Sequence, residues 1–158
     1  MAKYEAGFIG AGNMGGALAL AAAKKTGGDR IAVACSTRER SGAAAQRLGC
    51  TAETPQRILS DSRFVFLGVK PQMLPALLEE LKAPLLARKD RFVLVSMAAG
   101  ITIETIQKIL GLPCPVVRIM PNLPVALGKG VVLISPDDTV TEEEISALEK
   151  ALQPAGLL

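Results

Sequence analysis

The sequence contains no histidine and no tryptophan, and its few aromatic side chains are one tyrosine and four phenylalanines. Without histidine, a zinc site would depend on cysteine, and Cys35, Cys50 and Cys114 lack the spacing of metal ligands. We therefore expect no metal site. Because an odd number of cysteines also argues against a disulfide framework, we interpret these residues as small buried hydrophobes in a reducing cytoplasm.

The sequence also lacks a strong excess of charge and any long apolar run. It has 18 basic and 15 acidic residues, a net charge of +3, with no basic run and interleaved aromatics of the kind that binds nucleic acid. The apolar stretch Tyr4–Ile9 leads directly into glycines, unlike a signal peptide, and Ala17–Ala23 is too short to span a bilayer. We expect neither a nucleic-acid nor a membrane partner.

What the chain does have is a composition suited to one globular domain. It has 158 residues, of which 49% are hydrophobic and 21% charged, enough to bury a substantial core. Short apolar runs alternate with helical patterns. The expected strands are Tyr4–Ile9, Ile31–Cys35, Phe64–Val69, Phe92–Ser96, Val116–Met120 and Val131–Ser135.

The expected helices lie between these strands. They are Asn13–Lys25, Glu39–Leu48, Leu74–Ala87, Thr102–Leu110 and Glu142–Leu152. Thr141, with Glu144 three residues later, has the pattern of a capping box. Repeated strand–helix–strand units imply parallel pairing through right-handed crossovers. The sequence therefore predicts an α/β fold, a doubly wound and mostly parallel sheet of the Rossmann dinucleotide-binding type, over residues 1–158.

The chain ends where another apolar run begins, at Gly156-Leu157-Leu158. Because such runs normally become strands, we expect the sequence to be part of a longer protein with a second domain.

A glycine-rich segment follows the first expected strand. After Ile9, the residues Gly10-Ala11-Gly12-Asn13-Met14-Gly15 read G-x-G-x-x-G and open the first expected helix. In this pattern the first glycine permits a tight turn, the second lets the backbone approach a pyrophosphate, and the third lets the helix pack against the strand. The alternative is a turn that merely uses glycines. The context favours a dinucleotide site at the helix N-terminus.

The end of the second expected strand suggests which dinucleotide binds. NAD-selective domains usually carry Asp or Glu there, whereas this chain has Ser36-Thr37-Arg38. Two hydroxyls and a guanidinium suit a 2′-phosphate, with Arg38 pairing bidentately. Alternatively, Ser36 caps the following helix and Arg38 is solvated, and the neighbouring Glu39 could intrude. We expect NADP(H).

Three further strand ends are candidate sites. Lys70, in Val69-Lys70-Pro71, either faces phosphate or ribose or is simply exposed. The small residues of Met97-Ala98-Ala99-Gly100 either accommodate a flat nicotinamide ring or form a plain turn. Asn122, in the proline-rich segment 120–124, either binds a carboxamide or substrate or caps a turn.

Together these segments resemble pyrroline-5-carboxylate reductase, the enzyme of the last step of proline synthesis. The matching stretches, in the family's order and covering essentially the whole chain, are 7–15, 69–71, 95–101, 120–122 and Pro124. The resemblance implies that Ile9–Met14, Ser36 with its neighbours, Gly68–Pro71 and Met97–Ala99 line an NADP(H) site.

Three positions depart from the family pattern. The family often has Thr where Leu123 stands, Asn near Pro55 and Asp where Arg63 stands. The first two departures affect expected cofactor and substrate contacts.

The resemblance also implies a helical second domain, absent from this chain, that forms a homo-oligomer and holds the substrate carboxylate. The implied reaction is hydride transfer from NADPH to the C=N carbon of 1-pyrroline-5-carboxylate, which gives proline. The cofactor carries this chemistry, so the protein mainly positions the reactants, and no catalytic residue is assigned. The isolated chain is expected to be inactive. The alternatives are another NADP-linked dehydrogenase, of the 3-hydroxyacid type, and a non-catalytic nucleotide-binding module.

Overall fold

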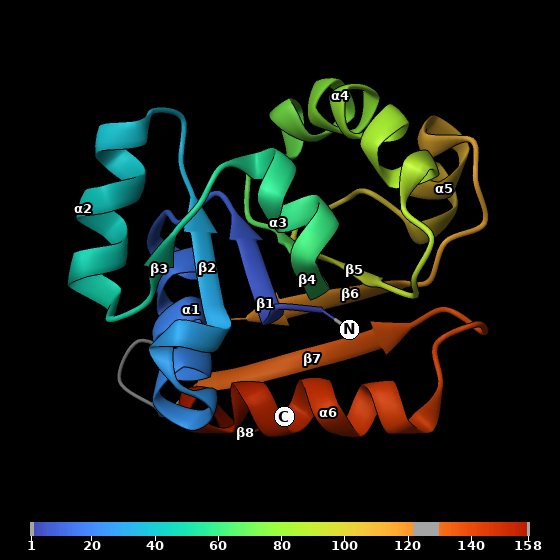
Figure 1. Ribbon diagram of the computed structural model, residues 1–158. Coiled ribbons are helices and arrows are strands. Elements are labelled where there is room, and N and C mark those ends of the chain that lie inside the picture. Colours follow the sequence, from blue (N-terminus) through green and yellow to red (C-terminus); the bar gives the residue numbers. More distant parts are fainter. Residues whose placement is uncertain (1, 122–129, 158) are drawn as a thin grey trace.

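The computed structural model describes residues 2–121 and 130–157. These residues form an eight-stranded sheet with the order β3-β2-β1-β4-β5-β6-β7-β8 (Figure 1). The strands are β1 (Tyr4–Ile9), β2 (Ile31–Ala34), β3 (Thr51–Ala52), β4 (Ser62–Leu67), β5 (Val93–Ser96), β6 (Val116–Pro121), β7 (Gly130–Pro136) and β8 (Gly156–Leu157).

Helices connect most of the strands. They are α1 (Asn13–Thr26), α2 (Arg38–Leu48), α3 (Pro55–Asp61), α4 (Leu74–Ala87), α5 (Ile103–Leu110) and α6 (Glu142–Leu152). Short 3₁₀ segments add η1 (Gly28–Arg30), η2 (Pro71–Met73) and η4 (Gln153–Ala155).

The strand order defines where a ligand is expected. Strands β1 to β6 pair in parallel, and the chain moves outward from β1 first toward β2 and β3, then toward β4, β5 and β6. This is the doubly wound order, and its direction reverses between β1 and β4. In such sheets ligands bind outside the carboxyl ends of the strands at the reversal. The predicted fold class is therefore confirmed.

Helices cover both faces of the centre of this sheet, so strands β1, β2, β4 and β5 are almost entirely buried, whereas β7 carries the exposed residues Val131 and Leu133. Helices α1, α2 and α6 cover one face and α3, α4 and α5 the other (Figure 1). The side chains of each group pack in a separate core cluster. At the centre, Phe8 of β1 stacks on Phe66 of β4 with ring centroids 4.2 Å apart. Helix α1 is rich in alanine because it is enclosed, with Leu18, Ala19 and Ala22 fully buried.

The five predicted helices are present, with ends within a residue or two of those expected. Two expected strands are shorter at their carboxyl ends, so Cys35, Gly68 and Val69 lie in loops. Two features were not predicted: the two-residue strand β3 and the helix α3. Helix α3 has only seven residues, too few for apolar residues to recur with a clear helical period. Its start does carry helix signals, since Thr54 is a favourable N-cap and Pro55 a favourable first residue.

The last strands depart from the parallel pattern. Strand β7 pairs with β6 in antiparallel orientation, whereas β8, the apolar run at the chain's end, pairs with β7 in parallel. The segment 122–129 between β6 and β7 lies outside the described residues. In the described part of the chain, no helix has both the length and the apolar character needed to cross a membrane.

An ion pair between Glu144 and Arg91 connects α6 to the segment before β5. The predicted capping box is present: Thr141 Oγ1 accepts from the Glu144 backbone N–H at 3.1 Å, and Glu144 accepts from the Thr141 N–H at 2.9 Å. Glu144 is only 7% exposed, and Arg91 donates to both of its carboxylate oxygens at 2.7 and 2.8 Å. These hydrogen bonds from Arg91 lower the pKa of the Glu144 carboxyl.

We expect Glu144→Gln to reduce the free energy of unfolding by about 2 kcal/mol near neutral pH, because Arg91 and the helix cap lose a charged acceptor. The folded-state pKa is lowered, so this stabilisation is complete above the unfolded value, about 4.3, and is lost as the pH falls through the lower folded value. Urea denaturation as a function of pH measures both effects.

The matched control is Glu143→Gln, one residue earlier and exposed. It removes the same charge at the same helix end and should leave stability nearly unchanged. Equal losses for the two variants, or a Glu144→Gln loss that persists at acid pH, would contradict the assignment.

Candidate dinucleotide site

The predicted site segments emerge from one edge of the sheet. In the strand registers, Ala34 of β2 pairs with Ile9 of β1, Ile9 with Leu67 of β4, and Leu67 with Ser96 of β5. Four neighbouring strands therefore end at the same level. The segments that follow them, beginning at Cys35, Gly10, Gly68 and Met97, are brought together at the carboxyl edge, as the sequence predicts.

Gly10 makes the turn from β1 into the loop. Its φ is +92°, a conformation that side chains rarely adopt. Its N–H donates to the Ala34 carbonyl at 2.9 Å, and the Gly68 N–H donates to the Ile9 carbonyl at 2.8 Å. A Cβ on Gly10 would lie 2.8 Å from the Gly68 carbonyl oxygen. The two glycines thus allow the backbones that leave β1 and β4 to touch.

The other two glycines of the motif differ in their surroundings. A Cβ on Gly15 would lie 2.6 Å from the Gly10 carbonyl oxygen, so Gly15 is required for α1 to pack against the end of β1. Gly12 is exposed, and a Cβ there would meet no protein atom within 4 Å. Packing within the protein therefore accounts for Gly10 and Gly15 but leaves Gly12 facing open space.

The N-terminus of α1 has no side-chain cap and no acidic residue in its first turn. Helix α4 also lacks a side-chain cap but continues directly from the 3₁₀ segment η2, whereas α2, α3, α5 and α6 are each capped by a threonine that accepts a backbone N–H. The exposed residues Gly12 and Asn13 begin the helix, so its first N–H groups are open to an outside acceptor. Such an end, with the positive pole of the helix dipole, suits an anion.

The hydroxyls after β2 have different partners. Thr37, not Ser36, caps α2, with Oγ1 accepting the Arg40 N–H at 3.1 Å. Ser36 Oγ accepts instead from the Arg40 guanidinium at 3.2 Å. Both hydroxyls are exposed and keep their own proton to donate. The sequence reasoning did not include Arg40, although its position four residues after Ser36 could have indicated this contact.

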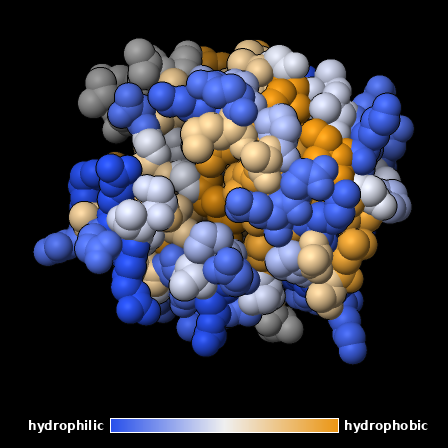
Figure 2. Space-filling model, turned by 90° about the horizontal axis from the view of Figure 1, so that it is seen from above, coloured by the Kyte–Doolittle hydropathy of each residue, from blue (hydrophilic) through white to orange (hydrophobic). Residues whose placement is uncertain are grey.

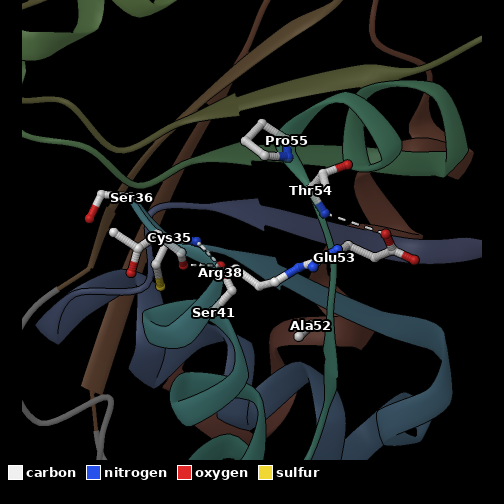
Figure 3. A pocket seen from close by; sticks show the side chains of 9 residues that line it. Cys35, Ser36, Arg38, Ser41, Ala52, Glu53, Thr54 and Pro55 are labelled. Carbon is white, nitrogen blue, oxygen red and sulfur yellow. Dashed lines mark hydrogen bonds between the residues drawn. The ribbon is translucent and has the colours of Figure 1, made fainter.

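Arg38 lines a pocket of about 330 Å³ beyond the end of β2, which we call the β2 pocket. The side chain extends across it toward Glu53, while Ser36 points away from Arg38 (Figure 3). Glu53 is held at this rim by the Tyr4 hydroxyl, which donates to Oε1 at 2.8 Å. Burial, followed by this hydrogen bond, raises the pKa of Tyr4 to about 12. Glu53 was not among the predicted site residues.

The far side of the β2 pocket is formed by the segment 52–55, the part of the chain that sequence reasoning left unassigned. Thr54 caps α3 there and Pro55 begins it. Pro55 is the position near which the resembling family often has Asn. This departure from the family pattern therefore lies in the lining of the β2 pocket.

A second pocket, which we call the loop pocket, lies between the glycine loop and α2. It has a volume of about 420 Å³ and includes Cys35 and Ser36, which also line the β2 pocket. The full lining is Gly10, Ala11, Gly12, Cys35, Ser36, Arg40, Ala43, Ala44, Arg47 and Val69. Figure 2 shows the face of the molecule toward which the carboxyl ends of β1 and β2 point. Hydrophobic residues gather there in a central hollow that hydrophilic residues border.

The remaining predicted residues within the described ranges lie at the same edge, and fewer contacts define their role. Lys70 is exposed and precedes Pro71, which begins η2. Ala98 is buried and its N–H donates to Ser96 Oγ at 3.3 Å, whereas Ala99 is exposed. Asn122 lies outside the described residues. The contributions of these residues to a cofactor site remain predictions.

The cysteines are free, and burial raises the pKa of both Cys50 and Cys114 to about 11. At neutral pH these two thiols are therefore protonated and poorly reactive. The described residues contain no group of three or more side chains placed to hold a metal ion.

Comparison with known proteins identifies the family. Residues 5–100 match the family model described as NADP oxidoreductase, coenzyme F420-dependent. The chain belongs to this family. It is also 36% identical over 153 residues to a pyrroline-5-carboxylate reductase of Aquifex aeolicus. This alignment covers 96% of the present chain and 55% of the relative. The chain is 34% identical over 158 residues to pyrroline-5-carboxylate reductase 3 of Danio rerio, covering 99% and 54%.

Among solved structures, a pyrroline-5-carboxylate reductase from Coxiella burnetii superposes with a TM-score of 0.86 at 25% identity, over 98% of this chain and 57% of that one. The resemblance predicted from the motifs is thus confirmed. The chain spans about half the length of the curated relatives it matches.

We expect Gly10→Ala to destabilise the fold by about 3 kcal/mol. The positive φ alone costs an L-residue roughly 1–2 kcal/mol, and the new methyl group would also collide with the Gly68 carbonyl. Equilibrium urea denaturation measures the loss. Gly111→Ala is the matched control, because Gly111 has a φ of +68° but open space around its Cβ position. A cost no larger at Gly10 than at Gly111 would show that the contact with Gly68 is unimportant.

Proposed function

We propose that this chain is the NADP(H)-binding half of a pyrroline-5-carboxylate reductase, a cytoplasmic enzyme that reduces 1-pyrroline-5-carboxylate to proline. The observation that carries the proposal is the open position at Gly12. The strand-end turn at Gly10 and the helix contact at Gly15 have internal packing reasons, whereas the free space beside Gly12 and the uncapped start of α1 are explained by a ligand. A dinucleotide diphosphate fits both features.

The proposed roles of this chain's residues follow from their positions. Ile9–Gly15 form the loop that holds the diphosphate, through the N–H groups at the uncapped start of α1, and Ser36 and Thr37 donate to the adenosine 2′-phosphate. Gly68–Pro71 and Met97–Ala99 border the path toward the nicotinamide, and Asn122, outside the described residues, stays a predicted contact. When bound, NADPH supplies the hydride that reduces the C=N carbon. The chain's task is to orient the cofactor, and it contributes no acid–base group that we assign.

The substrate side is proposed to come from a second, helical domain that also forms the homo-oligomer, as the family resemblance implies. This fits the chain's span of about half its relatives. Nucleic acid and membranes are not among the proposed partners. The free thiols support the reducing compartment. The family description also names coenzyme F420, whereas the relatives above carry the name of the imine reductase.

Binding is tested first on the chain itself. Titration calorimetry should show NADPH binding, and Gly12→Ala should weaken it by more than tenfold, because the added methyl group occupies the space of the diphosphate. The same variant should melt at the wild-type temperature, since no protein atom lies within 4 Å of the new group. The control is Gly42→Ala on α2, also exposed and uncrowded. Unchanged NADPH affinity in Gly12→Ala would contradict the proposed site.

The reaction is tested on the protein expressed from its complete reading frame. We expect it to oxidise NADPH when 1-pyrroline-5-carboxylate is supplied, with proline as the product identified by mass spectrometry. A 3-hydroxyacid with NADP⁺ is the comparison substrate. Reduction of NADP⁺ by the hydroxyacid without imine reduction would assign the protein to the dehydrogenase alternative. Tight NADPH binding without turnover of either substrate would indicate a non-catalytic nucleotide-binding module.

A further inference from the structure

The side of α2 that faces the glycine loop carries two arginines at a regular spacing. Arg40, Ala43, Ala44 and Arg47 all line the loop pocket. Seven residues of α-helix make two turns, roughly 10 Å along the axis, so the arginines lie at the two ends of one helix face. The alanines between them are short, which leaves room above this face for a ligand.

Arg40 lies at the end nearest β2. Its guanidinium donates to Ser36 Oγ at 3.2 Å, so the two side chains occupy the position where NAD-selective domains carry a carboxylate. Arg38 is directed the other way, across the β2 pocket toward Glu53 (Figure 3). Both arginines share a pocket with Ser36, but the guanidinium that donates a hydrogen bond to the Ser36 hydroxyl is that of Arg40.

Arg47 lies at the other end, beside the start of α1. It lines the loop pocket and also a neighbouring pocket with Gly12, Asn13 and Gly16. Its terminal nitrogen is 3.9 Å from the place where a Cβ on Gly16 would stand. The guanidinium thus lies against the first turn of α1, next to the uncapped N–H groups.

Among the residues that the structure describes, neither Arg40 nor Arg47 has an ion-pair partner. None of the residues that line the loop pocket is acidic. Two cations and a helix N-terminus around one carboxylate-free hollow favour a ligand with more than one anionic group.

We propose that Arg40 and Arg47 bind the two separate phosphate groups of the dinucleotide, an inference that rests on the proposed NADP(H) function. Arg40, with Ser36, binds the 2′-phosphate and sets the preference for NADP(H). Arg47 binds the diphosphate opposite the start of α1. Arg38, assigned to the 2′-phosphate from sequence, instead lies along the adenosine, where a planar guanidinium can stack on the adenine.

Calorimetric titrations of NADPH and NADH at constant ionic strength test this division. Arg40→Ala should weaken NADPH binding by about tenfold and change NADH binding by less than about twofold, because only NADPH carries the 2′-phosphate. Arg47→Ala should weaken both by a similar factor, roughly tenfold, because both carry the diphosphate. Arg38→Ala should leave the ratio of the two affinities unchanged. Arg40→Lys and Arg47→Lys should each lose less affinity than the corresponding alanine variant.

The matched control is Arg30→Ala, which removes an exposed arginine at the opposite end of β2. It should bind both cofactors as the wild type does. The inference is overturned if Arg40→Ala keeps the wild-type preference, if Arg38→Ala loses it, or if Arg47→Ala binds normally. Thermal unfolding confirms that each variant is folded. A wild type that binds neither cofactor refutes the proposed function, whereas a binding wild type with unaffected variants refutes only this inference.

Discussion

The contact between two glycine backbones is the constraint on which the candidate site depends. Gly10 and Gly68 follow the strands on either side of the topological reversal, and neither position has room for a Cβ. Their approach fixes where the loop after β1 turns and therefore where α1 begins. The direction of α1 then aims its free N–H groups at the hollow between β1 and α2. The packing at the sheet edge therefore also determines where an anion can reach the N–H groups of α1.

Much of this arrangement was predictable from sequence because local signals agree with the fold. Continuous apolar runs predicted buried strands, and the glycine spacing predicted the turn and the helix that follow β1. The capping pattern at Thr141 predicted the start of α6, where Glu144 also binds Arg91. The helix α3 and the strand β3 were not predictable in this way, because seven residues and two residues are too few for a period to emerge.

The side chains of the candidate site were harder to predict than its backbone. Sequence position alone suggested Arg38 as the nearest cation after β2, but the direction of a side chain at a helix start depends on the helix axis. In the structure Thr37 caps α2, Arg38 points across the β2 pocket toward Glu53, and the Arg40 guanidinium donates to Ser36 Oγ. Arg47 is eleven residues from Ser36 in sequence and joins the pocket only through the packing of α2 beside α1.

The uncapped start of α1 also has a thermodynamic consequence. In four other helices a threonine side chain accepts one of the first N–H groups, whereas α1 has no side-chain cap and begins at exposed residues. A dinucleotide held there binds only the folded chain, so its concentration enters the folding equilibrium; at a hundred times its Kd it adds about 2.7 kcal/mol. The helix end that the fold leaves incomplete thereby couples the domain's resistance to unfolding to the cell's supply of cofactor.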